Sequence, residues 1–78
     1  MRKEILDFAE AMERVMQKHD KEKGDSWKRM PHDELQELLR QEFDETEDED
    51  AKISEWVDVA NICMMIYSNT VKNGKEKE

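Results

Sequence analysis

Residues that interrupt helices are rare in this chain, which has two glycines and one proline among 78 residues. Sheet proteins need frequent turns, and these are usually supplied by Gly and Pro. Glu, Lys, Met and Leu, which favour helices, are abundant here. We therefore predict an all-α fold. The breakers Gly24, Pro31 and Gly74 divide the chain into three predicted helices, at about 3–19, 31–46 and 51–71.

The chain is short and unusually rich in charge. A domain of 78 residues is close to the lower limit for a self-sufficient core, and only 36% of the residues are apolar. We predict one helical domain over residues 1–73 and a charged tail at 74–78. The short acidic connector at 47–50 predicts that the second and third helices form a central antiparallel hairpin.

The formal net charge of −8 limits the choice of partners. It argues against nucleic acids and against anionic membrane surfaces, because both attract basic proteins. The longest apolar run, 62–67, is too short to span a bilayer, and no apolar segment typical of a signal peptide follows the N-terminus. The single cysteine, Cys63, has no partner for an internal disulfide. The sequence thus predicts a cytoplasmic location.

Two pairs of acidic residues fall where apolar residues would be expected. Each residue advances a helix by about 100°, which places Glu42 between Leu38 and Leu39 on the apolar face of the second helix, with Glu45 beside it. On the third helix, Glu55 and Asp58 share a face with buried-type residues. In contrast, Glu37, Arg40 and Asp44 point towards solvent.

These two pairs predict a metal site. A buried carboxylate must be paired, protonated or bound to a metal. A hairpin would bring Glu42 and Glu45 towards Glu55 and Asp58, and a site with only carboxylate ligands suits Mg²⁺ or Mn²⁺ rather than structural zinc. The alternative is that all four are ordinary surface acids.

The third helix predicts an oligomer. Its apolar residues surround the helix axis, so it should be buried on every side. Trp56 is interpreted as a core residue, and Met64 and Met65 as core or subunit interface. Two other helices can cover only part of this circumference. We therefore expect a homodimer or a homotetramer, in which the helical bundle is completed by a second subunit.

The motifs, taken in order, resemble those of MazG-like all-α nucleoside triphosphate pyrophosphohydrolases. Residues 42–45 and 55–58 match the family's ExxE and ExxD motifs. Residues 55–66 are similar to the ExxDVAN-x-x-MMI helix of small members, and residues 23–30 to their Gly/Trp/Lys loop. The resemblance covers nearly all of residues 1–73. One difference is that only residues 46–54 separate the motifs, where family members usually carry a longer hairpin.

The resemblance implies a Mg²⁺-dependent hydrolase that cuts a nucleoside triphosphate between its α and β phosphates. Glu42, Glu45, Glu55 and Asp58 would hold the metal, and Glu45 is the candidate general base. Trp27 would stack on the base or else cap the core, and Lys28 would reach a phosphate or else be solvated. Asn61 would contact sugar or phosphate, or make a structural hydrogen bond. The alternative function is a non-catalytic acidic module for oligomerisation or partner binding. His19, at the end of the first apolar stripe, is interpreted as a helix cap.

Overall fold

The computed structural model describes residues 1–47 and 52–74, and all regular structure in these ranges is helical. Helix α1 spans Lys3–Asp20, α2 spans His32–Thr46 and α3 spans Ile53–Lys72, with a short 3-10 helix, η1, at Ser26–Arg29. The predicted all-α class and the three α-helices are confirmed. The predicted acidic connector beyond Glu47 and the tail at 75–78 lie outside the described residues.

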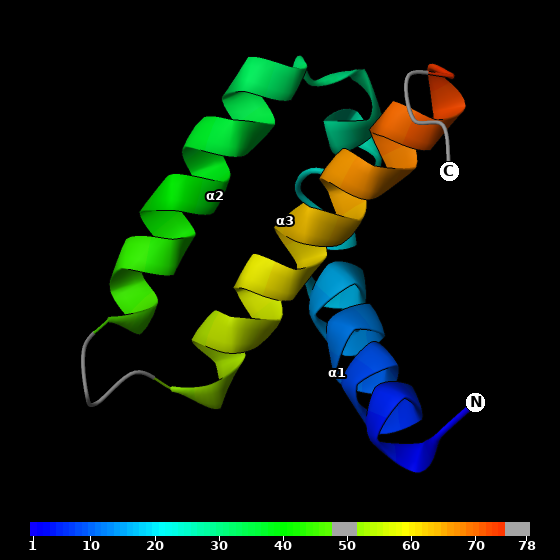
Figure 1. Cartoon of the computed structure of the whole chain (residues 1–78), viewed down its shortest axis with the longest axis vertical. Helices are drawn as coiled ribbons and strands as arrows, with labels where there is room; N and C mark the ends of the chain where they lie inside the picture. The colour runs from blue at the N-terminus through cyan, green and yellow to red at the C-terminus, as the bar shows by residue number, and fades with distance from the viewer. Residues whose placement is uncertain (48–51, 75–78) are drawn as a thin grey trace.

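Helix α1 is amphipathic, but only its second half is packed. Met12, Val15 and Met16 are partly buried, whereas every residue from Met1 to Glu10 is exposed. Figure 1 shows the N-terminal part of α1 diverging from α3, while its C-terminal end lies behind the middle of that helix. Lys18 and His19 occupy its last turn, where positive charge complements the helix dipole. The packed end of α1 therefore carries cationic side chains towards α3.

A tight turn at Gly24 redirects the chain after α1. The backbone N–H groups of Glu22 and Lys23 both donate to the carbonyl of His19, and that of Gly24 donates to the carbonyl of Asp20. Gly24 has a φ of +51°, a conformation that costs glycine little because it lacks a Cβ atom. The turn leads directly into η1, so the segment between α1 and α2 contains a short helix of its own.

Helix α2 begins one residue after the predicted start. Pro31 is its N-cap rather than its first helical residue, and the Pro31 carbonyl accepts the N–H of Leu35 at 3.2 Å. Met30 is extended, as expected for a residue before proline. Asp33 and Glu34 occupy the first turn, where negative charge is favourable. At the C-terminal end of α3, Asn73 and Gly74 follow the last helical residue as predicted, with Gly74 at φ +68°.

The core lies mainly between α2 and α3, which run side by side (Figure 1). Leu35 is completely buried, and Val57 and Ile62 from α3 are the other buried apolar residues among those described. Side chains in such a position contact many neighbours, so each contributes to stability well beyond its share of the sequence. The position of α2 on α3 thus depends on very few side chains.

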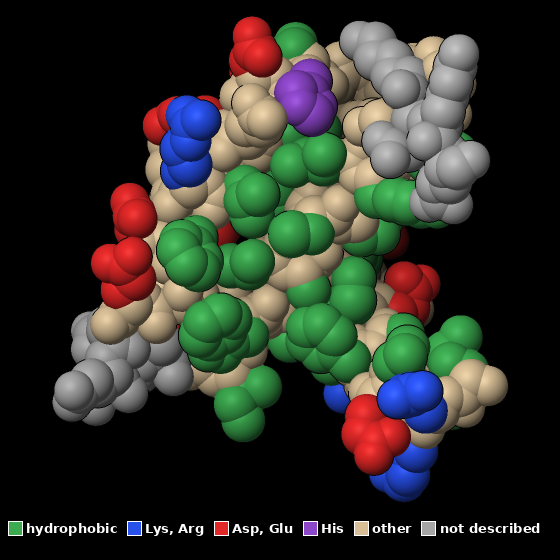
Figure 2. Space-filling model, viewed as in Figure 1, with side chains coloured by type: hydrophobic (Ala, Val, Ile, Leu, Met, Phe, Trp, Pro, Cys, Tyr) green, Lys and Arg blue, Asp and Glu red, His purple; other side chains and the backbone are tan. Residues whose placement is uncertain are grey.

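Much apolar surface remains exposed in the single chain. Figure 2 shows hydrophobic side chains gathered over α2, α3 and the adjoining part of α1. The large apolar side chains exposed on the three helices are Ile5, Leu6, Phe8, Phe43, Ile53, Trp56, Tyr67 and Val71. The interpretation of Trp56 as a core residue is therefore wrong for the single chain, in which it is 49% exposed. None of the described helices is both long and apolar enough to cross a membrane.

Leu35→Ala should lower the free energy of unfolding by about 2–5 kcal/mol, because it truncates a completely buried apolar side chain in the core between α2 and α3. Gln36→Ala, at the next and exposed position of α2, should change it by less than about 0.5 kcal/mol. Urea unfolding followed by circular dichroism measures both. Similar values for the two variants would contradict the described packing of α2 on α3.

Candidate functional site

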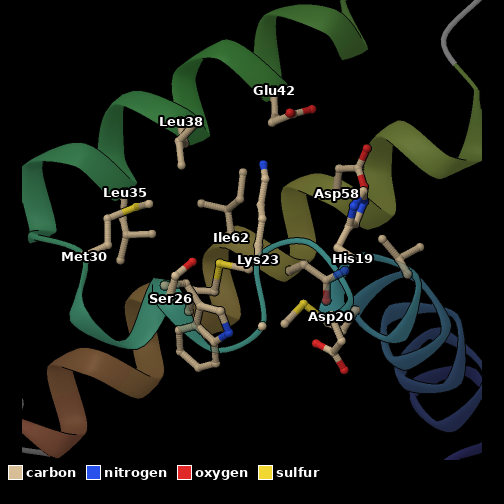
Figure 3. A pocket seen from close by; sticks show the side chains of 16 residues that line it. His19, Asp20, Lys23, Ser26, Met30, Leu35, Leu38, Glu42, Asp58 and Ile62 are labelled. Carbon is tan, nitrogen blue, oxygen red and sulfur yellow. The ribbon is translucent and has the colours of Figure 1, made fainter.

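A cleft of about 290 Å³ opens where α1, the Gly24 turn, η1, α2 and α3 meet. Its wall is apolar around Trp27, Met30, Leu35 and Ile62. Glu42 from α2 and Asp58 from α3 also line it, and Figure 3 shows both carboxylates at the same end. The cleft therefore has an apolar part and an acidic part, a combination that suits a ligand with one apolar and one charged end.

Glu42 is the carboxylate most affected by its surroundings. It lies on the same face of α2 as Leu35 and Leu38, as the helical geometry predicted, and it is partly buried. Burial raises the pKa of Glu42, and the proximity of Glu45, Asp58 and Glu55 raises it further. All four predicted carboxylates thus lie close enough to interact electrostatically at one end of the α2–α3 seam.

Asp58 faces Glu42 across the cleft and has cationic neighbours. Burial raises the pKa of Asp58, whereas His19 and Lys18 lower it and Glu45 raises it. Figure 3 shows the His19 side chain beside Asp58 at this end of the cleft. The end of α1 therefore supplies partial compensation for the acidic cluster.

The donor set fits a hard divalent cation. It consists of carboxylates, and one of the Glu55 oxygens is buried without a hydrogen-bond partner, as a ligand oxygen would be before binding. Glu45 is exposed and does not line the cleft. Within residues 1–47 and 52–74, no three His, Cys, Asp or Glu side chains are gathered tightly enough to form a complete metal site. Binding would thus require the four carboxylates to draw closer together.

Two of the three predicted substrate-binding residues line the cleft, and both are anchored. Asn61 is 3% exposed; its side-chain amide donates to the Met12 carbonyl at 3.3 Å, and its Oδ1 atom is buried without a partner. The Trp27 carbonyl accepts a hydrogen bond of 3.0 Å from Asn69 on α3, which ties η1 to that helix. The structural alternative for Asn61 is thus supported by a real contact between α3 and α1.

Lys28, the third predicted substrate-binding residue, lies outside the cleft. Its ammonium group pairs with Asp25 at 3.2 Å and lies 5.7 Å from the centre of the Trp27 ring. The basic side chains that do line the cleft belong to Lys23 and His19. His19 continues the apolar stripe of α1, a signal that could have identified it, whereas no pattern in the sequence singles out Lys23.

Comparison of the chain with protein-family models, curated proteins and solved structures found no match.

Replacement of Glu42 by Gln should flatten the dependence of stability on pH. A carboxyl whose pKa is raised by folding binds its proton more tightly in the folded state, so stability falls as pH rises from the ordinary value of 4.5 through the raised value. Gln removes this loss. Without added metal, the variant should be at least as stable as the parent at neutral pH.

Urea unfolding at a series of pH values from about 4 to 8 measures the effect. The control is Glu37→Gln, on the exposed side of α2, where Glu37 pairs with Arg40 at 3.5 Å. An unchanged pH dependence in Glu42→Gln, or the same flattening in both variants, would contradict the described surroundings of Glu42.

Proposed function

We propose that this protein is a Mg²⁺-dependent nucleotide pyrophosphohydrolase that converts a nucleoside triphosphate to a monophosphate and pyrophosphate. The observation that supports this most directly is the cleft itself, in which Glu42 and Asp58 adjoin an apolar wall containing Trp27. A nucleotide has a matching division, with a flat base at one end and a polyanion at the other. Mn²⁺ would be an alternative to Mg²⁺.

In this proposal Glu42, Glu45, Glu55 and Asp58 hold the metal. The bound ion would neutralise phosphate oxygens and orient a water molecule, which explains how an acidic cleft accepts a polyanion. Glu45 is assigned as the general base because it lies beside Glu42 yet is exposed, so its carboxylate is accessible to a water molecule. It would accept the proton of the water as that oxygen bonds to phosphorus and the bond between the α and β phosphates breaks.

The apolar part of the cleft would bind the nucleoside. Trp27 offers an aromatic face for stacking, and its backbone is fixed by the hydrogen bond from Asn69. Asn61 lies one helical turn beyond Asp58 and also lines the cleft, where it would contact the sugar. Lys28 would contact phosphate only after leaving Asp25, so its proposed role is the least supported.

We further propose that α2 and α3 form an antiparallel hairpin and that a second copy of the chain completes the bundle as a homodimer or homotetramer. The exposed apolar side chains on α1, α2 and α3 support this, because burying Trp56, Phe43 and Tyr67 against a partner would remove much apolar surface from water.

The same exposed surface favours a second candidate function. In that case the protein is a non-catalytic acidic module that oligomerises or binds a partner, and the short segment between its acidic motifs has cost the activity. The two candidate functions differ in whether Glu42 and Asp58 take part in a reaction.

The test of hydrolysis is pyrophosphate release from a panel of nucleoside triphosphates, with and without Mg²⁺. The parent should release pyrophosphate only with metal, and metal should raise its melting temperature, because an ion that binds the folded state stabilises it. Glu42→Gln should lose at least about 100-fold in rate and gain less from the metal. Glu37→Gln should behave as the parent. Metal-dependent melting without hydrolysis of any triphosphate would favour the non-catalytic module.

The test of assembly is light scattering at micromolar concentration. The parent should have the mass of a dimer or tetramer, and Trp56→Ser should increase the fraction of monomer, because it removes a large exposed aromatic side chain. A folded parent that remains monomeric would refute the proposed oligomer.

A further inference from the structure

Lys23 is the lysine that lines the cleft among the described residues, and its ammonium group has no carboxylate partner there. Lys3 pairs with Asp7 at 2.7 Å, and Lys28 pairs with Asp25 at 3.2 Å. No ion pair within 4.0 Å is formed by Lys23 in the described part of the chain. Its ammonium group is therefore available to an anion that enters the cleft.

The backbone fixes where the Lys23 side chain begins. The Lys23 N–H donates to the His19 carbonyl at 3.0 Å, and the Lys23 carbonyl accepts the N–H of Ser26 at 3.1 Å. The next residue, Gly24, has the positive φ that turns the chain. Figure 3 shows the result: the Lys23 side chain extends into the cleft, with its nitrogen directed towards α2. The residue is thus held on both sides at the edge of the cleft.

The position of the Lys23 ammonium group along the cleft indicates which part of a ligand it would contact. Figure 3 shows Lys23 between the acidic end, at Glu42 and Asp58, and the apolar end, at Met30 and Leu35. A nucleotide bound with its base at the apolar end and its outer phosphates at the carboxylates would place part of its phosphate chain between the two. A lysine ammonium there offers three donors to phosphate oxygens.

We propose that Lys23, rather than Lys28, is the residue that binds the phosphate chain of the substrate. The inference deepens the proposed function and rests on it for the identity of the ligand. Lys23 acts in binding: its positive charge offsets the charge of phosphate oxygens that the metal does not contact. The competing explanation is that Lys23 only neutralises Glu42 and Asp58. In that case its removal would strengthen metal binding and leave the affinity for phosphate unchanged.

The experiment is calorimetric titration of the protein with inorganic tripolyphosphate in excess Mg²⁺, a probe that has the phosphate chain but no base or sugar. Lys23→Gln should weaken binding at least about tenfold, the scale of one charge-assisted hydrogen bond. Lys23→Arg should retain most of the affinity, because it keeps the charge. Lys28→Gln tests the competing assignment of the phosphate contact to Lys28, and it should remain within about twofold of the parent because Lys28 pairs with Asp25 outside the cleft. Melting curves with Mg²⁺ alone, recorded for all four proteins, show whether each variant is folded and binds metal.

Lack of tripolyphosphate binding by the parent, a loss below fivefold in Lys23→Gln, or an equal loss in Lys28→Gln would overturn the inference. The experiment distinguishes failure of this inference from failure of the proposed function. If the affinities follow this order but no triphosphate is hydrolysed, Lys23 binds phosphate and the proposed hydrolysis is wrong. If hydrolysis is found but Lys23→Gln binds as the parent does, the hydrolysis stands and the inference fails.

Discussion

The packing of α2 against α3 is the interaction on which the rest of the molecule depends. Leu35, Val57 and Ile62 are the buried apolar side chains of the described chain, and they join these two helices. Glu42 lies two turns beyond Leu35 on α2, and Asp58 lies one turn before Ile62 on α3. The contacts that bury the leucine therefore also hold the two carboxylates opposite each other. A shift of one helix along the other would therefore have two effects at once: it would separate the acidic groups and expose the core.

The acidic cluster that would bind a ligand also lowers the stability of the metal-free fold. Burial and mutual repulsion both raise the pKa of Glu42, which means that its ionised form destabilises the metal-free fold at neutral pH. Partial compensation comes from the end of α1, where His19 and Lys18 lie near Asp58. A small protein with so few buried apolar residues has little stability in reserve. Retention of an unfavourable acidic cluster in such a chain is easier to explain by ligand binding than by packing.

Helical periodicity predicted much of this structure, because it depends on local geometry. It gave the three α-helices, the inward position of Glu42 and the outward positions of Glu37 and Arg40. It failed where the outcome depends on contacts between distant segments. Trp56 lies on an apolar helix, yet in the single chain about half of its surface remains exposed. Likewise, the turn at Gly24 directs Lys23 into the cleft and leaves Lys28 with Asp25, a choice that depends on φ at one glycine and on η1.

The carboxylates at the α2–α3 seam, rather than other acids of this chain, are the proposed ligands of the metal. Titration with Mn²⁺ while recording amide NMR signals tests it directly, since a bound paramagnetic ion broadens the signals nearest to it. Signals of residues 42–45 and 55–58 should broaden first, and those of Glu10 and Glu13 on α1 should broaden only at higher metal concentration. Equal broadening at all exposed acidic residues, or earlier broadening at residues 47–50, would contradict it.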